Sequence, residues 1–339
     1  MWRGERLDRP CIAVQAPSGR QEPWPPSPAT AEARWLDPDY ITAAARATLA
    51  NTWWGGEAIP GVLVMAGWTV CLGGTPRFAP ETIWWEPRPF DFERPPELGF
   101  EPHGPWVQRH TRVYLAVAAL AGRDEFLVGR PCLLPANDLL SMLMGTERFM
   151  LGLVDHPEWM RAAIRQGGAA QGRAMQYYQE RLRVDHDFWY GQAGWMPFWA
   201  PEPYCATQSD VSCMLSPGMF DEFVLPELEL LHQAGGPLWY HLDGGDARQH
   251  LPRLLSLPWL RVVQYTPAPS EPPNGPAHLA LYRQVQASGK IVHLQVSVEH
   301  VEPLVRGLDP GLLILDTRCP SIADGQELLR AAVRWSRSG

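Results

Sequence analysis

Four short apolar runs between residues 237 and 316 decide the fold: PLWYHL (237–242), LRVVQY (260–265), KIVHLQV (290–296) and LLILD (312–316). Apolar residues occupy both alternating positions of each run, as they do in strands of a parallel sheet that helices cover on both faces. Their first residues are 23, 30 and 22 positions apart, which leaves room for a helix in each connection. The stretch therefore predicts successive strand–helix units.

The same alternation of strands and helices extends beyond this stretch. Further elements are expected at 11–17 and 126–129 (strands) and at 37–49, 219–233 and 325–335 (helices). Ser216-Pro217 predicts a helix N-cap followed by the first helical residue. No Gly-x-Gly-x-x-Gly motif follows an early strand, which disfavours a dinucleotide-binding sheet.

We predict an α/β protein built as a (β/α)8 TIM-type barrel in a single structural domain. Residues 104–339 are expected to form the main body of the barrel. Residues 1–103, rich in proline and tryptophan, are expected to form an N-terminal extension that packs on the barrel and contributes its first elements.

Composition excludes several classes of function. The 339 residues include 37 acidic and 29 basic side chains, a net charge of −8, which argues against nucleic-acid binding. Lys290 is the one lysine in the sequence, and no Gly-Lys-Ser/Thr motif occurs. Because Lys290 precedes its predicted strand, at the end away from the mouth of the barrel, Schiff-base chemistry is excluded as well.

Cysteine spacing and hydropathy predict a cytoplasmic protein with free thiols. The six cysteines form no Cys-x-x-Cys pair, so neither a zinc ribbon nor a thioredoxin-type motif is expected. The first residues, MWRGERLDRP, lack the apolar core of a signal peptide. The longest apolar run, at 113–122, is too short to span a membrane.

Reactive side chains of strand–helix units gather just beyond the C-terminal ends of the strands. The candidates at those positions are Asn137, Asp138, Gln208, Asp210, His241, Asp243, Gln264, Tyr265, Thr266, Arg318 and Cys319. Two roles stay open for Asp210: a general acid or base, or an acceptor of hydrogen bonds from loop amides. Tryptophans in WWGG, TIWWEP, DFWYGQAGWMPFW and PLWYHL are numerous enough that some could line a flat apolar pocket.

Cys319 is the best candidate for a reactive thiol. Pro320 suits the first position of a helix, which would place Cys319 at or beside the N-cap of the last helix. There the positive end of the helix dipole would favour the thiolate, which is a nucleophile or a metal ligand. The alternative is a small buried residue beside a proline turn.

His241 and Asp243 lie two positions apart on one strand, so their side chains point to the same side. Imidazole, carboxylate and thiolate from His241, Asp243 and Cys319 would form a three-ligand zinc site with an open fourth position, as in catalytic zinc sites. Alternatively, Asp243 orients His241 or caps the following helix.

The chain from Trp195 to Trp335 resembles the uroporphyrinogen decarboxylase superfamily, especially its decarboxylase-like branch and the corrinoid-dependent methyltransferases. The resemblance rests on QSDVSCMLSPGMFDEFVLPEL (208–228), WYHLDGG (239–245), VVQYTP (262–267) and LDTRCPSIADGQELL (315–329). GGEAIP (55–60) and ETIWWEP (81–87) are also similar to that branch. The resemblance implies a distorted TIM-type barrel with an N-terminal extension.

In the methyltransferase members, a His-x-Cys at one strand end and a later Cys hold zinc. His241 and Cys319 match the first and last ligands, whereas Asp243 stands at the middle position. The arginine-rich RQAGRY-type segment of true uroporphyrinogen decarboxylases is absent, so the resemblance favours methyl transfer over decarboxylation.

We therefore expect a zinc-dependent methyltransferase that acts on a small thiol or methoxy substrate. No Asp-x-His-x-x-Gly motif occurs, so the corrinoid would be carried by a separate partner protein. Asp210 and Asp243 are the expected catalytic residues, and the expected substrate contacts are Gln208, Gln264, Tyr265, Arg318 and Trp195. The alternatives are a metal-independent decarboxylase of a carboxylate-rich ring such as a tetrapyrrole and a non-catalytic ligand-binding barrel; the oligomeric state, monomer or homodimer, stays open.

Overall fold

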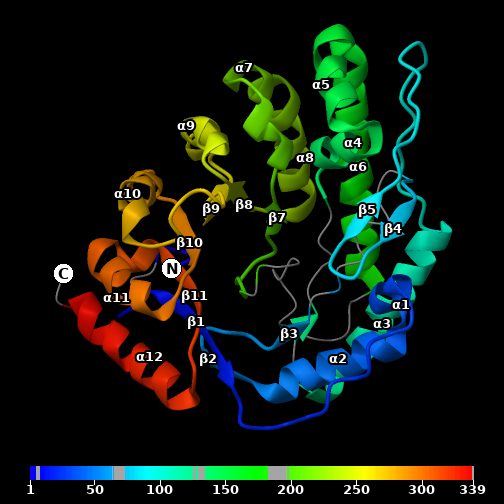
Figure 1. Cartoon of the computed structure of the whole chain (residues 1–339). Coiled ribbons are helices and arrows are strands. Elements are labelled where there is room, and N and C mark those ends of the chain that lie inside the picture. Colours follow the sequence, from blue (N-terminus) through cyan, green and yellow to red (C-terminus); the bar gives the residue numbers. More distant parts are fainter. Residues whose placement is uncertain are drawn as a thin grey trace.

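The computed structural model of the chain describes residues 1–4, 8–62, 64, 73–124, 127–128, 134–181, 196 and 198–337 (Figure 1). The strands are β1 (Cys11–Pro17), β2 (Thr52–Gly56), β3 (Gly61–Val62), β4 (Pro76–Phe78), β5 (Ile83–Trp85), β6 (Leu127–Val128), β7 (Cys205–Thr207), β8 (Leu238–Asp243), β9 (Leu260–Thr266), β10 (Ile291–Gln295) and β11 (Leu313–Arg318).

The α-helices are α1 (Ala31–Leu36), α2 (Pro38–Asn51), α3 (Pro105–Asp124), α4 (Ala136–Met144), α5 (Thr146–Asp155), α6 (Pro157–Arg181), α7 (Pro217–Met219), α8 (Leu225–Gly235), α9 (Leu251–Leu255), α10 (Leu279–Ala287), α11 (Val298–Gly307) and α12 (Ile322–Arg337). Short 3₁₀ helices are η2 (Asp210–Met214), η4 (Asp246–His250), η5 (Pro276–His278) and η6 (Pro310–Leu312), and η3 (Phe220–Val224) is a π-helical turn.

A seven-stranded sheet in the order β2-β1-β11-β10-β9-β8-β7 forms the centre of the molecule. All neighbouring pairs are parallel except β1 and β2. In Figure 1 the helices α9 to α12 follow one side of this sheet, between and beside the strands that they connect. The α/β class and the predicted strands of the C-terminal half are confirmed.

The closed (β/α)8 barrel is not confirmed. Closure requires each strand to pair on both sides, and within the described part of the chain β2 and β7 each have one neighbour. Within the strand predicted at 126–129, residues 127–128 form β6, which pairs with β3 in a separate two-stranded sheet. The described residues therefore form an open, mostly parallel sheet.

The two faces of the sheet carry different side chains because successive residues of a strand alternate between faces. Leu313 and Leu315 of β11 lie in the large apolar core that packs against the helices. Ile314, between them, belongs to a smaller apolar cluster together with Ala13, Trp239, Val262 and Ile291. We call the face that carries this smaller cluster the inner face.

The helix predicted at 219–233 is divided into α7, the turn η3 and α8. Ser216 caps α7, as predicted, and accepts a hydrogen bond from the Met219 backbone N–H at 3.3 Å. Pro226 has no N–H and cannot complete a regular helical turn, and a wider turn is one way in which helices accommodate this. The prediction of a continuous helix was therefore too simple.

Lys290 directly precedes β10, at the end of the sheet where the parallel strands begin. Its Nζ donates a hydrogen bond to the carbonyl oxygen of Leu257 at 2.8 Å, and burial lowers the pKa of the ammonium group. In the described part of the chain no helix is both long and apolar enough to cross a membrane.

A buried carboxylate from another helix caps the N-terminus of α4. Glu227 of α8 is 1% exposed and accepts hydrogen bonds from the backbone N–H groups of Ala136 and Asn137 and from the Asn137 side-chain amide. The first N–H groups of a helix lack partners within the helix, so this contact stabilises α4 and fixes it against α8. Burial nevertheless raises the pKa of Glu227 to about 7.

Replacing Glu227 with Gln tests the raised pKa of this buried acid. The pKa of about 7 in the folded chain exceeds the ordinary value of 4.5, so the folded state holds the proton more tightly. Stability should therefore fall as the pH rises from about 4.5 to about 7, by about 3 kcal/mol for this group. Glu227→Gln should lack this component when both proteins are unfolded with urea across that range. Parallel curves of unfolding free energy against pH would contradict the raised pKa.

Candidate functional site

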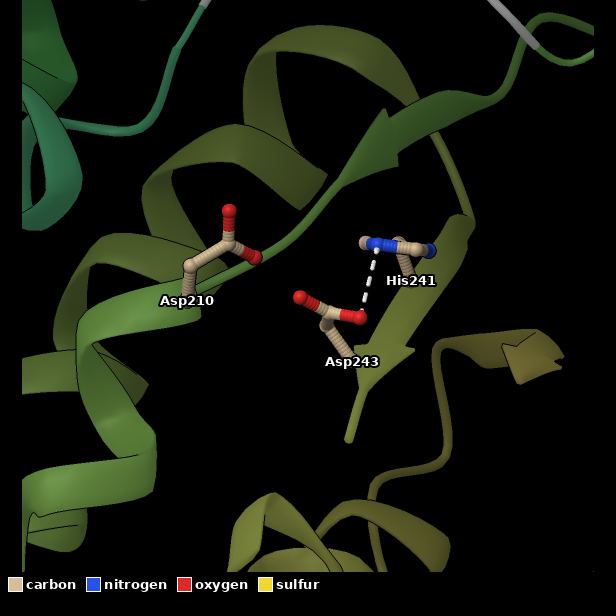
Figure 2. Close-up of side chains that lie close together, drawn as sticks. All are labelled: Asp210, His241 and Asp243. Atoms are coloured by element: carbon tan, nitrogen blue, oxygen red, sulfur yellow. Dashed lines mark ion pairs between the residues drawn. The ribbon is translucent and has the colours of Figure 1, made fainter. Parts of the chain in front are cut away.

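Three predicted site residues come together at the C-terminal ends of β7 and β8. Asp210, His241 and Asp243 each offer a ligand atom, and these atoms lie within 4.8 Å of one another. His241 Nε2 is 4.0 Å from Asp243 Oδ1. Figure 2 shows His241 and Asp243 side by side on β8, with the Asp210 carboxylate facing them from η2. We call these residues the triad.

The orientation of the His241 ring is set by Gln264 of the neighbouring strand β9. The side-chain amide nitrogen of Gln264 donates to the Tyr265 carbonyl oxygen at 3.0 Å and to Thr266 Oγ1 at 3.1 Å. Its amide oxygen therefore faces His241 Nδ1 and accepts the hydrogen bond from it. With the proton on Nδ1, the lone pair of neutral His241 is on Nε2, the nitrogen beside Asp243.

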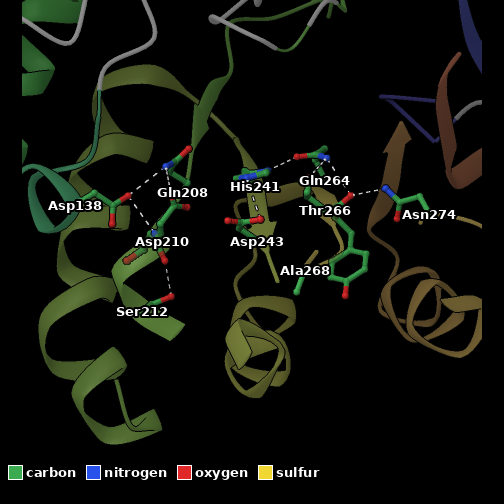
Figure 3. A network of polar contacts seen from close by, with 12 residues as sticks. Asp138, Gln208, Asp210, Ser212, His241, Asp243, Gln264, Thr266, Ala268 and Asn274 are labelled. Carbon is green, nitrogen blue, oxygen red and sulfur yellow. Dashed lines mark hydrogen bonds and ion pairs between the residues drawn. The ribbon is translucent and has the colours of Figure 1, made fainter. Parts of the chain in front are cut away.

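Asp210 is held in place by Asp138, a buried residue of α4. The Asp138 carboxylate accepts hydrogen bonds from the backbone N–H groups of Asp210 at 3.1 Å and Val211 at 3.0 Å, at the start of η2. The Gln208 amide bridges the two acids, at 3.3 Å from Asp138 Oδ2 and 2.6 Å from Asp210 Oδ2. Figure 3 shows this network beside the one that links His241 to Gln264 and Thr266.

The triad and Asp138 bring three acidic side chains close together. Loss of hydration, followed by the charges of Asp138 and Asp243, raises the pKa of Asp210 to about 8, although part of its side chain is exposed. Burial also raises the pKa of Asp138. Among the residues that the structure describes, none of these three carboxylates pairs with an arginine or lysine. A cation at the triad would favour the ionised forms of these acids.

Cys319 does not join the triad. Cys319 is 4% exposed and lies in the large core against the helices, together with Leu313 and Leu315 of β11. Alternation along the strand places it on the face opposite Asp316 and Arg318. The expected ligand set of His241, Asp243 and Cys319 is therefore corrected: the third side chain beside His241 and Asp243 is Asp210.

The predicted N-cap role of Cys319 is also wrong. Helix α12 begins at Ile322, and Ser321 caps it by accepting a hydrogen bond from the Asp324 backbone N–H at 3.2 Å. Pro320 lies before the cap rather than inside the first turn. Burial, with a smaller contribution from Asp324, raises the pKa of the Cys319 thiol, so the predicted easy ionisation is not found.

Only some of the residues expected to contact the substrate lie beside the triad. Gln208 and Gln264 lie at the site but are engaged with the triad and Asp138. Tyr265 is 1% exposed in the large core and donates to Glu271 at 3.0 Å, so its placement does not support a substrate contact. Arg318 is exposed at the end of β11. Trp195 lies outside the described residues.

Asp138 is the residue whose importance the sequence did not show. Its position after an apolar run placed it among the candidates, but nothing in the sequence pairs it with residues 210 and 211. Its burial, 4% exposed, and its two backbone contacts give it a role in shaping the site.

Tryptophans do line a cavity, but not beside the triad. A cavity of about 480 Å³ contains Trp2, Trp199 and Trp239 among its lining residues. Cys11 and Ile291, the first residues of β1 and β10, also line it. It therefore lies where the parallel strands begin, whereas the triad lies where they end.

Comparison with known proteins supports the fold. No protein-family model and no curated protein matches the chain. Among solved structures, a methyltransferase from Methanosarcina mazei is similar over 98% of this chain and 96% of its own, with a TM-score of 0.61 and 14% sequence identity. At this identity the similarity establishes a shared overall fold.

The orientation of His241 can be tested by replacing Gln264 with Leu. Loss of the acceptor amide should shift neutral His241 from the Nδ1–H form toward the Nε2–H form that usually predominates in a free histidine side chain. Long-range ¹H–¹⁵N NMR correlations distinguish the two forms. The same Nδ1–H pattern in both proteins would show that Gln264 does not set the tautomer.

Proposed function

We propose that the chain is a zinc-dependent methyltransferase in which Asp210, His241 and Asp243 hold the metal. The observation that carries the proposal is the convergence of one imidazole and two carboxylates, with the imidazole oriented by Gln264. The position at the C-terminal ends of parallel strands is where such folds place their chemistry. The fold shared with a methyltransferase adds support.

The donor set fits zinc. Zinc accepts imidazole nitrogen and carboxylate oxygen at roughly 2.0–2.2 Å, and three protein ligands with one open position are typical of catalytic sites. The three donor atoms already lie within 4.8 Å of one another, so modest side-chain rotation would bring them around one ion. The other ring nitrogen of His241, Nδ1, donates a hydrogen bond through its N–H to an amide oxygen, a contact typical of metal-bound histidines.

When bound, zinc would lower the pKa of a substrate thiol or withdraw electrons from the oxygen of a methoxy group. Gln264 keeps the Nε2 lone pair of His241 directed to the site, and Asp138 and Gln208 hold the Asp210 carboxylate in place. Asp243 and Asp210 are partly exposed, so a small substrate can approach the triad from solvent. A corrinoid on a separate protein would exchange the methyl group with this substrate.

Decarboxylation of a carboxylate-rich ring is less well supported at this site. An anionic substrate needs cationic partners, and within the described residues no arginine or lysine pairs with Asp138, Asp210 or Asp243. Three acids and an imidazole suit a cation better.

Metal analysis of the purified protein tests the ligand set. Wild type should contain about one zinc ion per chain after purification with zinc, and His241→Ala and Asp210→Ala should lose most of it. Cys319→Ser is the matched control and should keep its zinc, because Cys319 packs in the core against the helices. Absence of zinc from wild type would overturn the proposal, and loss from Cys319→Ser with retention in Asp210→Ala would restore the cysteine ligand.

Methyl transfer can be tested with free methylcobalamin and a small thiol, 2-mercaptoethanol, without oxygen. The sulfur takes the methyl group, the thiol proton is released, and the electron pair of the carbon–cobalt bond stays on cobalt, giving cob(I)alamin. The visible spectrum should change with zinc-loaded wild type and change at least about tenfold more slowly with His241→Ala. Equal rates with and without protein would count against transfer to this thiol.

A further inference from the structure

Asp138 stands out as a buried acid at the edge of the triad. It lies in the first turn of α4 and is 4% exposed. Burial of a carboxylate is costly unless hydrogen bonds or a cation compensate it. The structure supplies the hydrogen bonds from a segment 70 residues further along the chain, at Gln208, Asp210 and Val211.

These contacts fix both the backbone and the side chain of Asp210. The two backbone N–H groups at the start of η2 bind separate oxygens of Asp138, which sets the position of this turn against α4. Gln208 then links Oδ2 of Asp138, the oxygen that accepts from the Asp210 N–H, to the Asp210 carboxylate. In Figure 3 this chain of contacts ends on the side of Asp210 that neighbours His241 and Asp243.

The charge of Asp138 acts in the same direction as its geometry. Its carboxylate accepts a hydrogen bond from the Asp210 backbone N–H, and the Gln208 amide links it to the Asp210 side chain, so it lies at the edge of the triad. A divalent cation at the triad would attract this carboxylate together with those of Asp210 and Asp243.

We propose that Asp138 is a positioning residue of the metal site: through η2 and Gln208 it directs Asp210 toward His241 and Asp243, and its buried charge strengthens cation binding there. This inference rests on the proposed function. It adds a residue outside the ligand set on which the metal affinity depends.

Glu227 provides a matched control. It too is a buried acid that binds backbone N–H groups at a helix start, and it contacts the same helix, α4. However, its hydrogen bonds go to Ala136 and Asn137 rather than to the segment that carries Asp210. Loss of either acid should destabilise the fold, whereas only loss of Asp138 should weaken the metal site.

The experiment is titration of metal-free full-length protein with Zn²⁺ by isothermal calorimetry, with urea unfolding as the measure of stability. Asp138→Asn should raise the zinc dissociation constant about 10- to 100-fold, the usual effect of removing a partner of a metal ligand. Glu227→Gln should change it less than about threefold at comparable loss of stability. Gln208→Leu, which leaves the buried acid in place, should weaken binding severalfold even if Asp138→Asn does not fold.

A double variant shows whether Asp138 acts through Asp210. In an Asp210→Asn background, Asp138→Asn should have a much smaller effect on zinc affinity than it has alone. If wild type binds zinc and Asp138→Asn and Gln208→Leu bind it as well as Glu227→Gln, the inference is wrong while the proposed function stands. If wild type does not bind zinc, the proposed function itself fails.

Discussion

The alternation of side chains across the parallel strands governs which residues can act together in this molecule. On β8, Trp239, His241 and Asp243 share the inner face, while Leu238, Tyr240 and Leu242 enter the core against the helices. The same rule on β11 sends Asp316 and Arg318 inward and Cys319 outward. One residue of displacement in a strand therefore decides whether a side chain reaches the site or stabilises the core.

Much of this arrangement could be predicted from the sequence, and the errors have physical causes. The apolar runs of β8 to β11 and the pairing of His241 with Asp243 follow from local periodicity. The placement of Cys319 failed because Pro320 was taken as the first helical residue, whereas Ser321 caps α12. Asp138 could not be assigned because its partners lie about 70 residues away, and no local pattern encodes such a contact.

Helix α4 links the two halves of the described chain through buried acids. It receives the Glu227 carboxylate from α8 at its N-terminus and offers its own Asp138 carboxylate to η2. The Glu227 contact replaces a cap from Pro135, which offers no side-chain hydrogen bond, and the Asp138 contact does the same for η2, whose N-cap Ser209 makes none. The Glu227 contact thus holds the start of α4 against α8, whereas the Asp138 contact holds Asp210 beside the triad.

The location of Lys290 has a practical consequence. It is the one lysine of the sequence, and it sits where β10 begins, at the opposite end of the sheet from Asp210, His241 and Asp243. Burial lowers the pKa of its amine, which increases the reactive, uncharged fraction near neutral pH. Attaching the Lys290 side chain to a sensor surface by amine chemistry would consequently hold the protein by the end of the sheet where β10 begins, with the triad facing outward.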